Sequence, residues 1–79
     1  MMNMEGRAAL IEELEARGFK PGKAQAFGWT YTHKKDGFLL EFNASGQFKF
    51  VIKGQPVQNG VIEKPEDVLQ LIDKAAEAM

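Results

Sequence analysis

The stretch that decides the fold is residues 27–53, FGWTYTHKKDGFLLEFNASGQFKFVIK. In three consecutive runs of it, large apolar side chains alternate with other residues. A period of two is typical of strands that bury one face and leave the other in water. The alternation predicts strands over about residues 26–32, 38–43 and 48–53. They turn one set of bulky side chains toward the same side of a sheet: Phe27, Trp29, Tyr31, Phe38, Leu40, Phe42, Phe48, Phe50 and Ile52.

Two glycine-containing turns separate the three expected strands. Residues 34–37 (KKDG) and 43–46 (NASG) each end in a glycine, which suits a positive φ. Because both connections are short, neighbouring strands must run antiparallel, which gives a meander.

The chain after the third strand is expected to be an extended return over residues 54–64. Gly54-Gln55 and Asn59-Gly60 are predicted turns, and a short fourth strand can form around Val57. This return leads into the last segment.

Helical periodicity flanks the strands at both ends of the chain. Apolar residues recur at three- and four-residue spacing between Leu10 and Leu14, which predicts a helix over about 4–17, ended by Gly18. Pro65 suits the first position of a second helix over about 65–78, and an apolar stripe follows it.

These elements predict an α+β fold of one small domain, residues 1–79. Its order is α-β-β-β-α, with an antiparallel three-stranded meander and room for a short fourth strand. The sheet has one apolar face and each helix one apolar stripe. The expected architecture is therefore a two-layer sandwich in which both helices cover the same face of the sheet.

Composition leaves little chemistry for an enzyme. The chain has no cysteine, one histidine and one serine, so we expect no catalytic residue, no cofactor, no metal site and no small-molecule substrate. The apolar runs are only a few residues long, and the start lacks a basic region followed by an apolar stretch. These features predict no membrane association and a cytoplasmic location. His33 is expected to be a surface residue at the end of the first strand.

The sheet face away from the helices is the candidate binding surface. Its simplest explanation is a solvated face, because a single-sided sheet always presents polar side chains to water. The functional alternative is a docking face for an acidic protein or a polyanion, with a basic rim at Lys34 and Lys35. The candidate binding residues are Thr30, Thr32, Glu41, Asn43, Lys49, Val51, Lys53, Lys34 and Lys35.

The function expected from this surface is that of a non-enzymatic protein–protein interaction module, a small adaptor or inhibitor of a size that suits a phage or mobile element. It would dock through the open sheet face or a strand edge, and its partner would be another protein or a second copy of the chain. A nucleic-acid-binding module is the first alternative, because residues 19–54 hold six lysines against two acidic residues, a net charge of +4. Those lysines are Lys20, Lys23, Lys34, Lys35, Lys49 and Lys53.

The order of elements resembles that of double-stranded-RNA-binding domains and of small ribonuclease toxins. The second resemblance implies a further alternative, an RNA-cleaving toxin with His33 as its base. Residues 64–67 (KPED) stand where the RNA-binding family has a lysine-rich run at its second helix. Residues 27–33 (FGWTYTH) offer only an offset histidine where the toxins have a glycine–serine–histidine stretch. No functional residue carries over from either family.

Overall fold

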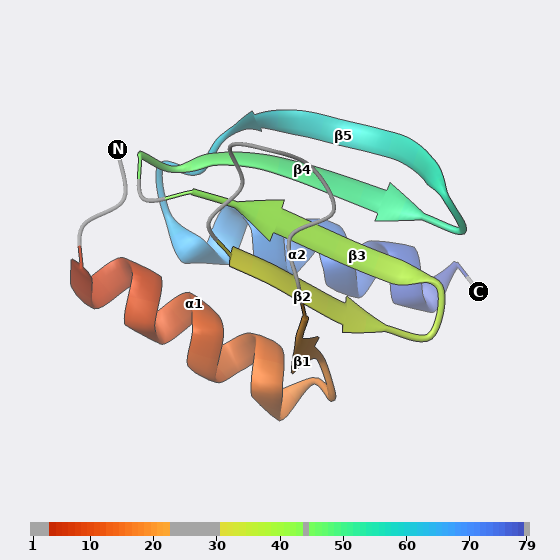
Figure 1. Ribbon diagram of the computed structural model, residues 1–79, viewed down its shortest axis with the longest axis horizontal. Coiled ribbons are helices and arrows are strands. Elements are labelled where there is room, and N and C mark those ends of the chain that lie inside the picture. The colour runs from red at the N-terminus through yellow and green to blue at the C-terminus, as the bar shows by residue number, and fades with distance from the viewer. Residues whose placement is uncertain (1–3, 23–30, 44, 79) are drawn as a thin grey trace.

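Along the chain, one helix comes first, the five strands of an antiparallel sheet follow, and a second helix comes last (Figure 1). The computed structural model describes residues 4–22, 31–43 and 45–78. The elements are α1 (Met4–Ala16), β1 (Lys20–Pro21), β2 (Tyr31–Lys35), β3 (Phe38–Phe42), β4 (Gln47–Ile52), β5 (Gln55–Val61) and α2 (Pro65–Glu77).

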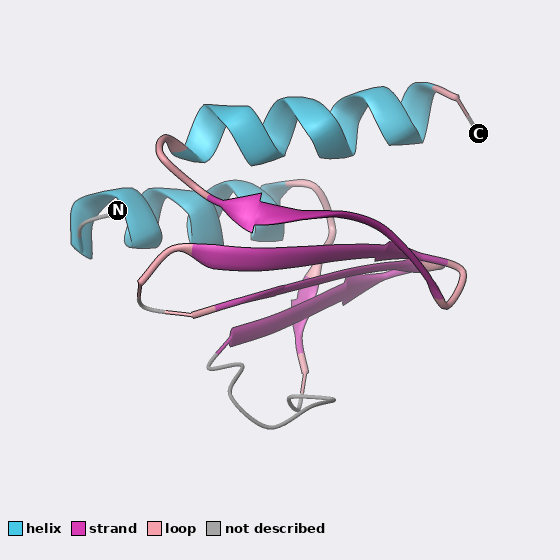
Figure 2. Ribbon diagram, turned by 90° about the horizontal axis from the view of Figure 1, so that it is seen from above, coloured by secondary structure: helices cyan, strands magenta, loops and turns pink. Residues whose placement is uncertain are grey.

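Both helices lie on the same side of the sheet, as Figure 2 shows. The strands are ordered β1-β2-β3-β4-β5, and every neighbouring pair is antiparallel. The predicted two-layer α+β architecture is therefore confirmed. The strand count differs, because the two-residue β1 pairs with β2, and β5 is a full strand. The start of the first expected strand, with Phe27, Trp29 and Thr30, lies outside the described residues.

The strand register brings bulky side chains into rows that face the helices. Tyr31 lies opposite Phe42, which lies opposite Phe48. Two further rows run parallel to this one, and helix and loop residues complete the core. Among the described residues, the buried core consists of Leu10, Leu14, Phe19, Phe38, Leu40, Phe42, Phe48, Phe50, Ile62, Val68, Leu69 and Ile72. The prediction that the bulky side chains of the alternating runs point toward one face of the sheet is confirmed for those that the structure describes.

The C-terminal end of α1 is closed by backbone and side-chain bonds. Gly18 takes a φ of +90°, and the Phe19 N–H donates to the carbonyl of Leu14 at 2.9 Å. Glycine takes this conformation without a Cβ clash, and the reversal brings the ring of Phe19 into the core. The Lys35 ammonium donates to the Arg17 carbonyl at 2.6 Å, where a cation complements the negative end of the helix dipole.

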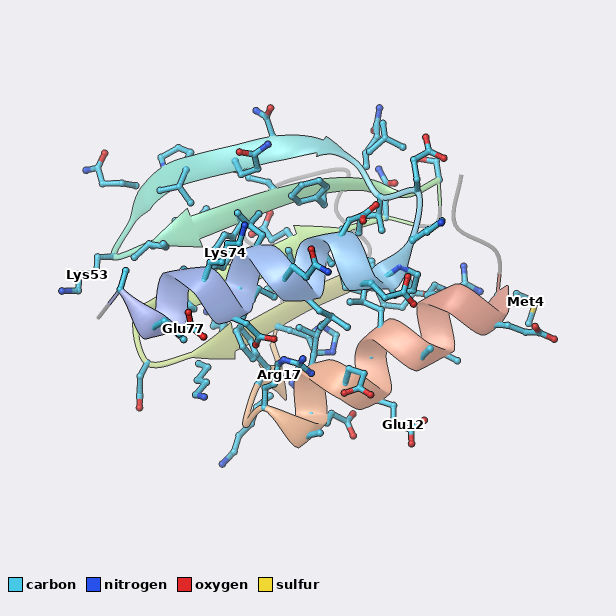
Figure 3. All side chains as sticks on the ribbon, turned by 180° about the vertical axis from the view of Figure 1, so that it is seen from behind. Met4, Glu12, Arg17, Lys53, Lys74 and Glu77 are labelled. Carbon is cyan, nitrogen blue, oxygen red and sulfur yellow. The ribbon has the colours of Figure 1, made fainter. Side chains whose placement is uncertain are left out.

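An ion pair joins the two helices on their outer surface. Arg17 points from the end of α1 toward α2 (Figure 3), and it donates from Nε and Nη2 to the two carboxylate oxygens of Asp73 at 2.9 and 3.0 Å. Arg17 also bonds Glu13, one turn earlier. The bond from Arg17 holds the pKa of Asp73 below its usual range. Exposed pairs of this kind contribute about 0.2–1 kcal/mol, so this one orients the helices more than it stabilises them.

The turn between β4 and β5 is formed by Lys53 and Gly54. Their φ angles are +51° and +80°, and two consecutive positive values are typical of the hairpin turn that matches strand twist. The turn predicted at Gly54-Gln55 is thus wrong by one residue. The turn predicted at Asn59-Gly60 is also wrong, because both residues lie inside β5, where pairing with β4 outweighs their local preference.

Lys53 supplies a stability prediction, because a lysine side chain is strained at positive φ. Asparagine tolerates this conformation better, so Lys53→Asn should raise the free energy of unfolding by about 0.5–1 kcal/mol. Urea denaturation of the two proteins measures the gain. Lys34→Asn is the matched control, because Lys34 is an exposed lysine within β2 and has no positive φ. A gain of equal size in both variants would contradict the role of the turn.

Candidate functional site

The sheet face opposite the helices is not the bare plane that the sequence predicts. Thr32, Glu41 and Lys49 form one row across β2, β3 and β4. Thr32 and Glu41 are each only 2% exposed, and Val51, in the next row, is also buried. The prediction assumed that a single-sided sheet leaves its second face in water. Three of its candidate binding residues are instead shielded from solvent, while Lys49 is half-buried.

Two polar atoms of this row are buried without a partner. Neither the Thr32 hydroxyl nor Oε2 of Glu41 has a hydrogen-bond partner in the described parts of the chain. Burying a polar group without a bond costs free energy, and for a carboxylate the opposite charge of a neighbour reduces the cost. Lys49 is the cross-strand neighbour of Glu41 and supplies such a charge. The row therefore has a structural explanation and offers a partner little accessible surface.

Asn43 is committed to the turn between β3 and β4. Its Oδ1 accepts hydrogen bonds from the Ser45 N–H, the Ser45 hydroxyl and the Gln47 N–H at 2.6–3.2 Å. Its Nδ2 donates to the side chain of Gln47 at 3.1 Å. A side chain that holds a turn in this way is part of the scaffold. Asn43 is thus a structural residue where the sequence suggested a binding residue.

The remaining candidate lysines gather at one end of the sheet. Lys34 lies directly across from Lys20 in the β1–β2 pair, and both are exposed. Lys35 is tied to the end of α1, and Lys53 lies in the β4–β5 turn, which bonds the Gly37 carbonyl. Lys20, Lys34, Lys35 and Lys53 thus lie at one end of the sheet, and Lys23 lies outside the described residues. The use of these lysines for nucleic acid stays a prediction.

His33 is a core residue, and its predicted place on the surface is wrong. Its side chain is 3% exposed, faces the helices from the middle of β2 and stacks on Phe42 with ring centroids 5.8 Å apart. Burial lowers the pKa of its imidazole, against a smaller opposite effect from Glu15 on α1. Neither ring nitrogen has a hydrogen-bond partner in the described residues. A general base must reach its substrate, so the toxin alternative loses its candidate base.

The most accessible feature of the sheet is β5. It occupies one edge, and all seven of its residues are exposed, including Val57 at 49% and Val61 at 53%. Its sequence, QPVQNGV, contains no charged residue. Sheet edges in soluble proteins are usually protected by charge, short length or a covering element. Within β5 itself, two features of this kind lie near its beginning: Pro56, and a shift in the register with β4 between Phe50 and Val51.

A groove runs beside β5 on the helix side of the sheet. It has a volume of about 320 Å³ and lies between β5 and α2. Its apolar walls are completed by one carboxylate and one amide: Phe48, Val61, Ile62, Val68, Leu71, Asp67 and Gln58. Side chains of an added strand that pointed toward the helices would enter this groove, because side chains alternate between the two faces. Sequence reasoning missed the groove, since it requires β5 and α2 to be placed together.

Other functional chemistry finds little support in the described residues. In residues 4–22, 31–43 and 45–78, no three histidine or acidic side chains come together as a metal site would require. Neither α1 nor α2 has the length and apolarity needed to cross a bilayer. Comparison of the chain with protein-family models, curated proteins and solved structures finds no match.

Proposed function

We propose that the chain is a non-enzymatic protein-interaction module that docks through the free edge of β5. The observation that carries this proposal is a seven-residue edge strand, exposed throughout and free of charge. An edge strand presents backbone N–H and C=O groups that an extended segment can pair with, and this supplies affinity without a preformed pocket. The groove between β5 and α2 supports the proposal, because it offers side chains of the added strand an apolar site.

The backbone direction of β5 supports the same edge. The Ile62 N–H, just beyond β5, donates to the Gly46 carbonyl at 2.7 Å and therefore points toward the β4 side. N–H groups alternate in direction along an antiparallel strand, so those of Val61 and Asn59 point away from β4. These two groups are directed to the outside of the sheet, where an added strand would lie.

Site-specific photo-cross-linking in the cells that carry this protein tests the proposal. A diazirine-bearing residue placed at position 61 should give a defined cross-linked product, because it lies on the docking edge. The matched control carries the same residue at position 12, which is exposed on α1 and points away from the sheet (Figure 3). Mass spectrometry of the cross-linked peptides identifies the product. Equal products from both positions, or none from position 61, would overturn the proposal.

A further inference from the structure

We infer that the segment which pairs with β5 carries a large apolar side chain and, two positions before it, a lysine or arginine. The apolar side chain would fill the groove between β5 and α2, and the basic side chain would pair with Asp67 at the rim of that groove. This inference rests on the proposed function and names the chemistry of the partner, an extended segment of another protein.

The second half of β5 is the part that can guide an added strand. Val57 is the extra residue where the register with β4 shifts, and the register is continuous from Gln58 to Val61. Within this continuous part, Asn59 and Val61 direct their N–H groups away from β4. The added strand is therefore placed along residues 58–62.

The side chain of the added strand that lies across from Gly60 would enter the groove. Gly60 pairs with Phe48, whose ring belongs to the core on the helix side, and opposite residues of neighbouring strands share a face. Gly60 has no side chain, and a Cβ placed there would lie 3.5 Å from the Phe48 ring. Phe48 also lines the groove of about 320 Å³, together with Val68 and Leu71 of α2. This apolar lining suits a large aliphatic or aromatic side chain.

The groove is acidic at the end where α2 begins. This helix starts beyond the end of β5 and runs back along the sheet (Figure 1), so Asp67, in its first turn, lies toward Ile62. Asp67 is exposed, and its carboxylate forms no ion pair within the described part of the chain. Residues 55–79 contain five acidic residues against two lysines, a net charge of −3. A basic side chain across from Ile62 would therefore meet an opposite charge.

The direction of the added strand sets the order of the two side chains. Every strand pair of this sheet is antiparallel, and antiparallel pairing is slightly more stable per residue than parallel pairing. In an added antiparallel strand, the residue across from Ile62 precedes the residue across from Gly60 by two positions. Residues at this spacing share one face of a strand, so both side chains point toward the helices.

A second copy of β5 does not fit this pattern, because QPVQNGV contains no basic residue. Elsewhere in the sequence, a basic residue stands two positions before a large apolar residue at residues 17–19 (RGF) and 49–51 (KFV). Both apolar residues, Phe19 and Val51, are buried in the fold. The partner is therefore a different protein.

Selection of phage-displayed random heptapeptides on the purified full chain tests the pattern. The wild type should enrich peptides with a lysine or arginine two positions before a large apolar residue. Asp67→Lys should instead enrich aspartate or glutamate at the first of these positions, because the charge at the rim is reversed. Glu66→Lys is the matched control, because it makes the same charge change in the same turn of α2 but lines the separate groove between the two helices.

The control should keep the preference of the wild type, and circular dichroism verifies that both variants fold. Fluorescence anisotropy of a labelled peptide from the wild-type selection gives the size of the effect. Exchange of its basic residue for glutamate should weaken binding to the wild type about fivefold and strengthen binding to Asp67→Lys. No enriched pattern, a basic preference that persists in Asp67→Lys, or an equal loss of that preference in Glu66→Lys would overturn the inference.

The cross-linking experiment separates this inference from the proposed function. A product from position 61 whose cross-linked segment lacks the pattern would overturn the inference and leave the proposed function standing. A product with a second copy of the chain would do the same. The absence of any product from position 61 would overturn the proposed function itself.

Discussion

Truncation of Phe42 is expected to cost about 3–5 kcal/mol of unfolding free energy, the usual range for removing a buried phenylalanine ring. Phe42 is fully buried and stacks on two neighbours from β2: Tyr31, with ring centroids 4.9 Å apart, and His33. The guanidinium of Arg7 on α1 lies 5.7 Å from the Tyr31 ring, so the stack extends to the first helix. Phe42→Ala would leave a cavity where strands and helix meet.

The size of this loss is large for so short a chain. A domain of 79 residues has a total stability of about 4–12 kcal/mol, so Phe42→Ala should leave a substantial unfolded population. Urea denaturation at 25 °C measures the change. Phe42→Leu keeps most of the apolar volume and should lose about 1–1.5 kcal/mol. Met4→Ala is the control at an exposed apolar position, and a loss there equal to that of Phe42→Ala would contradict this description of the core.

Acidification should destabilise the protein through His33. Burial lowers the pKa of this imidazole from its ordinary value of 6.5. Between that value and the lowered one, the unfolded chain binds more protons than the folded chain, so stability falls as the pH falls. The stabilisation is complete above pH 6.5, and its loss below that pH has a slope of at most about 1.4 kcal/mol per pH unit.

The test is denaturation at a series of pH values between about 7 and 5, above the ordinary range of carboxyl titration. The charged group that acts on His33 is Glu15 of α1, which favours the protonated form but less strongly than burial opposes it. His33→Leu should flatten the profile and be at least as stable as the wild type, because it removes two buried ring nitrogens that have no hydrogen-bond partner among the described residues. An unchanged slope in this variant would show that another group is responsible.

The fold could be predicted where a strong period covered several residues. Alternation over residues 38–42 and 48–52 fixed the inner face of β3 and β4, and helical spacing placed α1 and α2. The prediction failed where local and tertiary preferences disagree. Asn59-Gly60 favours a turn in isolation, but pairing with β4 places it inside the C-terminal half of β5.

The candidate site was harder to predict, because exposure depends on what packs over a residue. Alternation correctly assigned Thr32 and Glu41 to the face away from the helices, but it carries no information about their burial. The same limitation applies to His33. Its place in the alternating run puts it on the helix side with Tyr31, but the run does not show that its side chain is buried there. The sequence shows that residues 55–61 carry no charge. It does not show that they form an edge strand, and the absence of charge matters only at an edge.

The match between sheet order and chain order has a kinetic consequence. Each of the five described strands pairs with the strand that precedes or follows it, so the pairings among them join near neighbours in the sequence. Loop closure for such pairings is entropically inexpensive, and domains dominated by them fold quickly. The contact between α1 and α2, which includes the ion pair between Arg17 and Asp73, joins opposite ends of the chain. The meander can therefore form as a rapid nucleus, with the docking of the two ends as the late step.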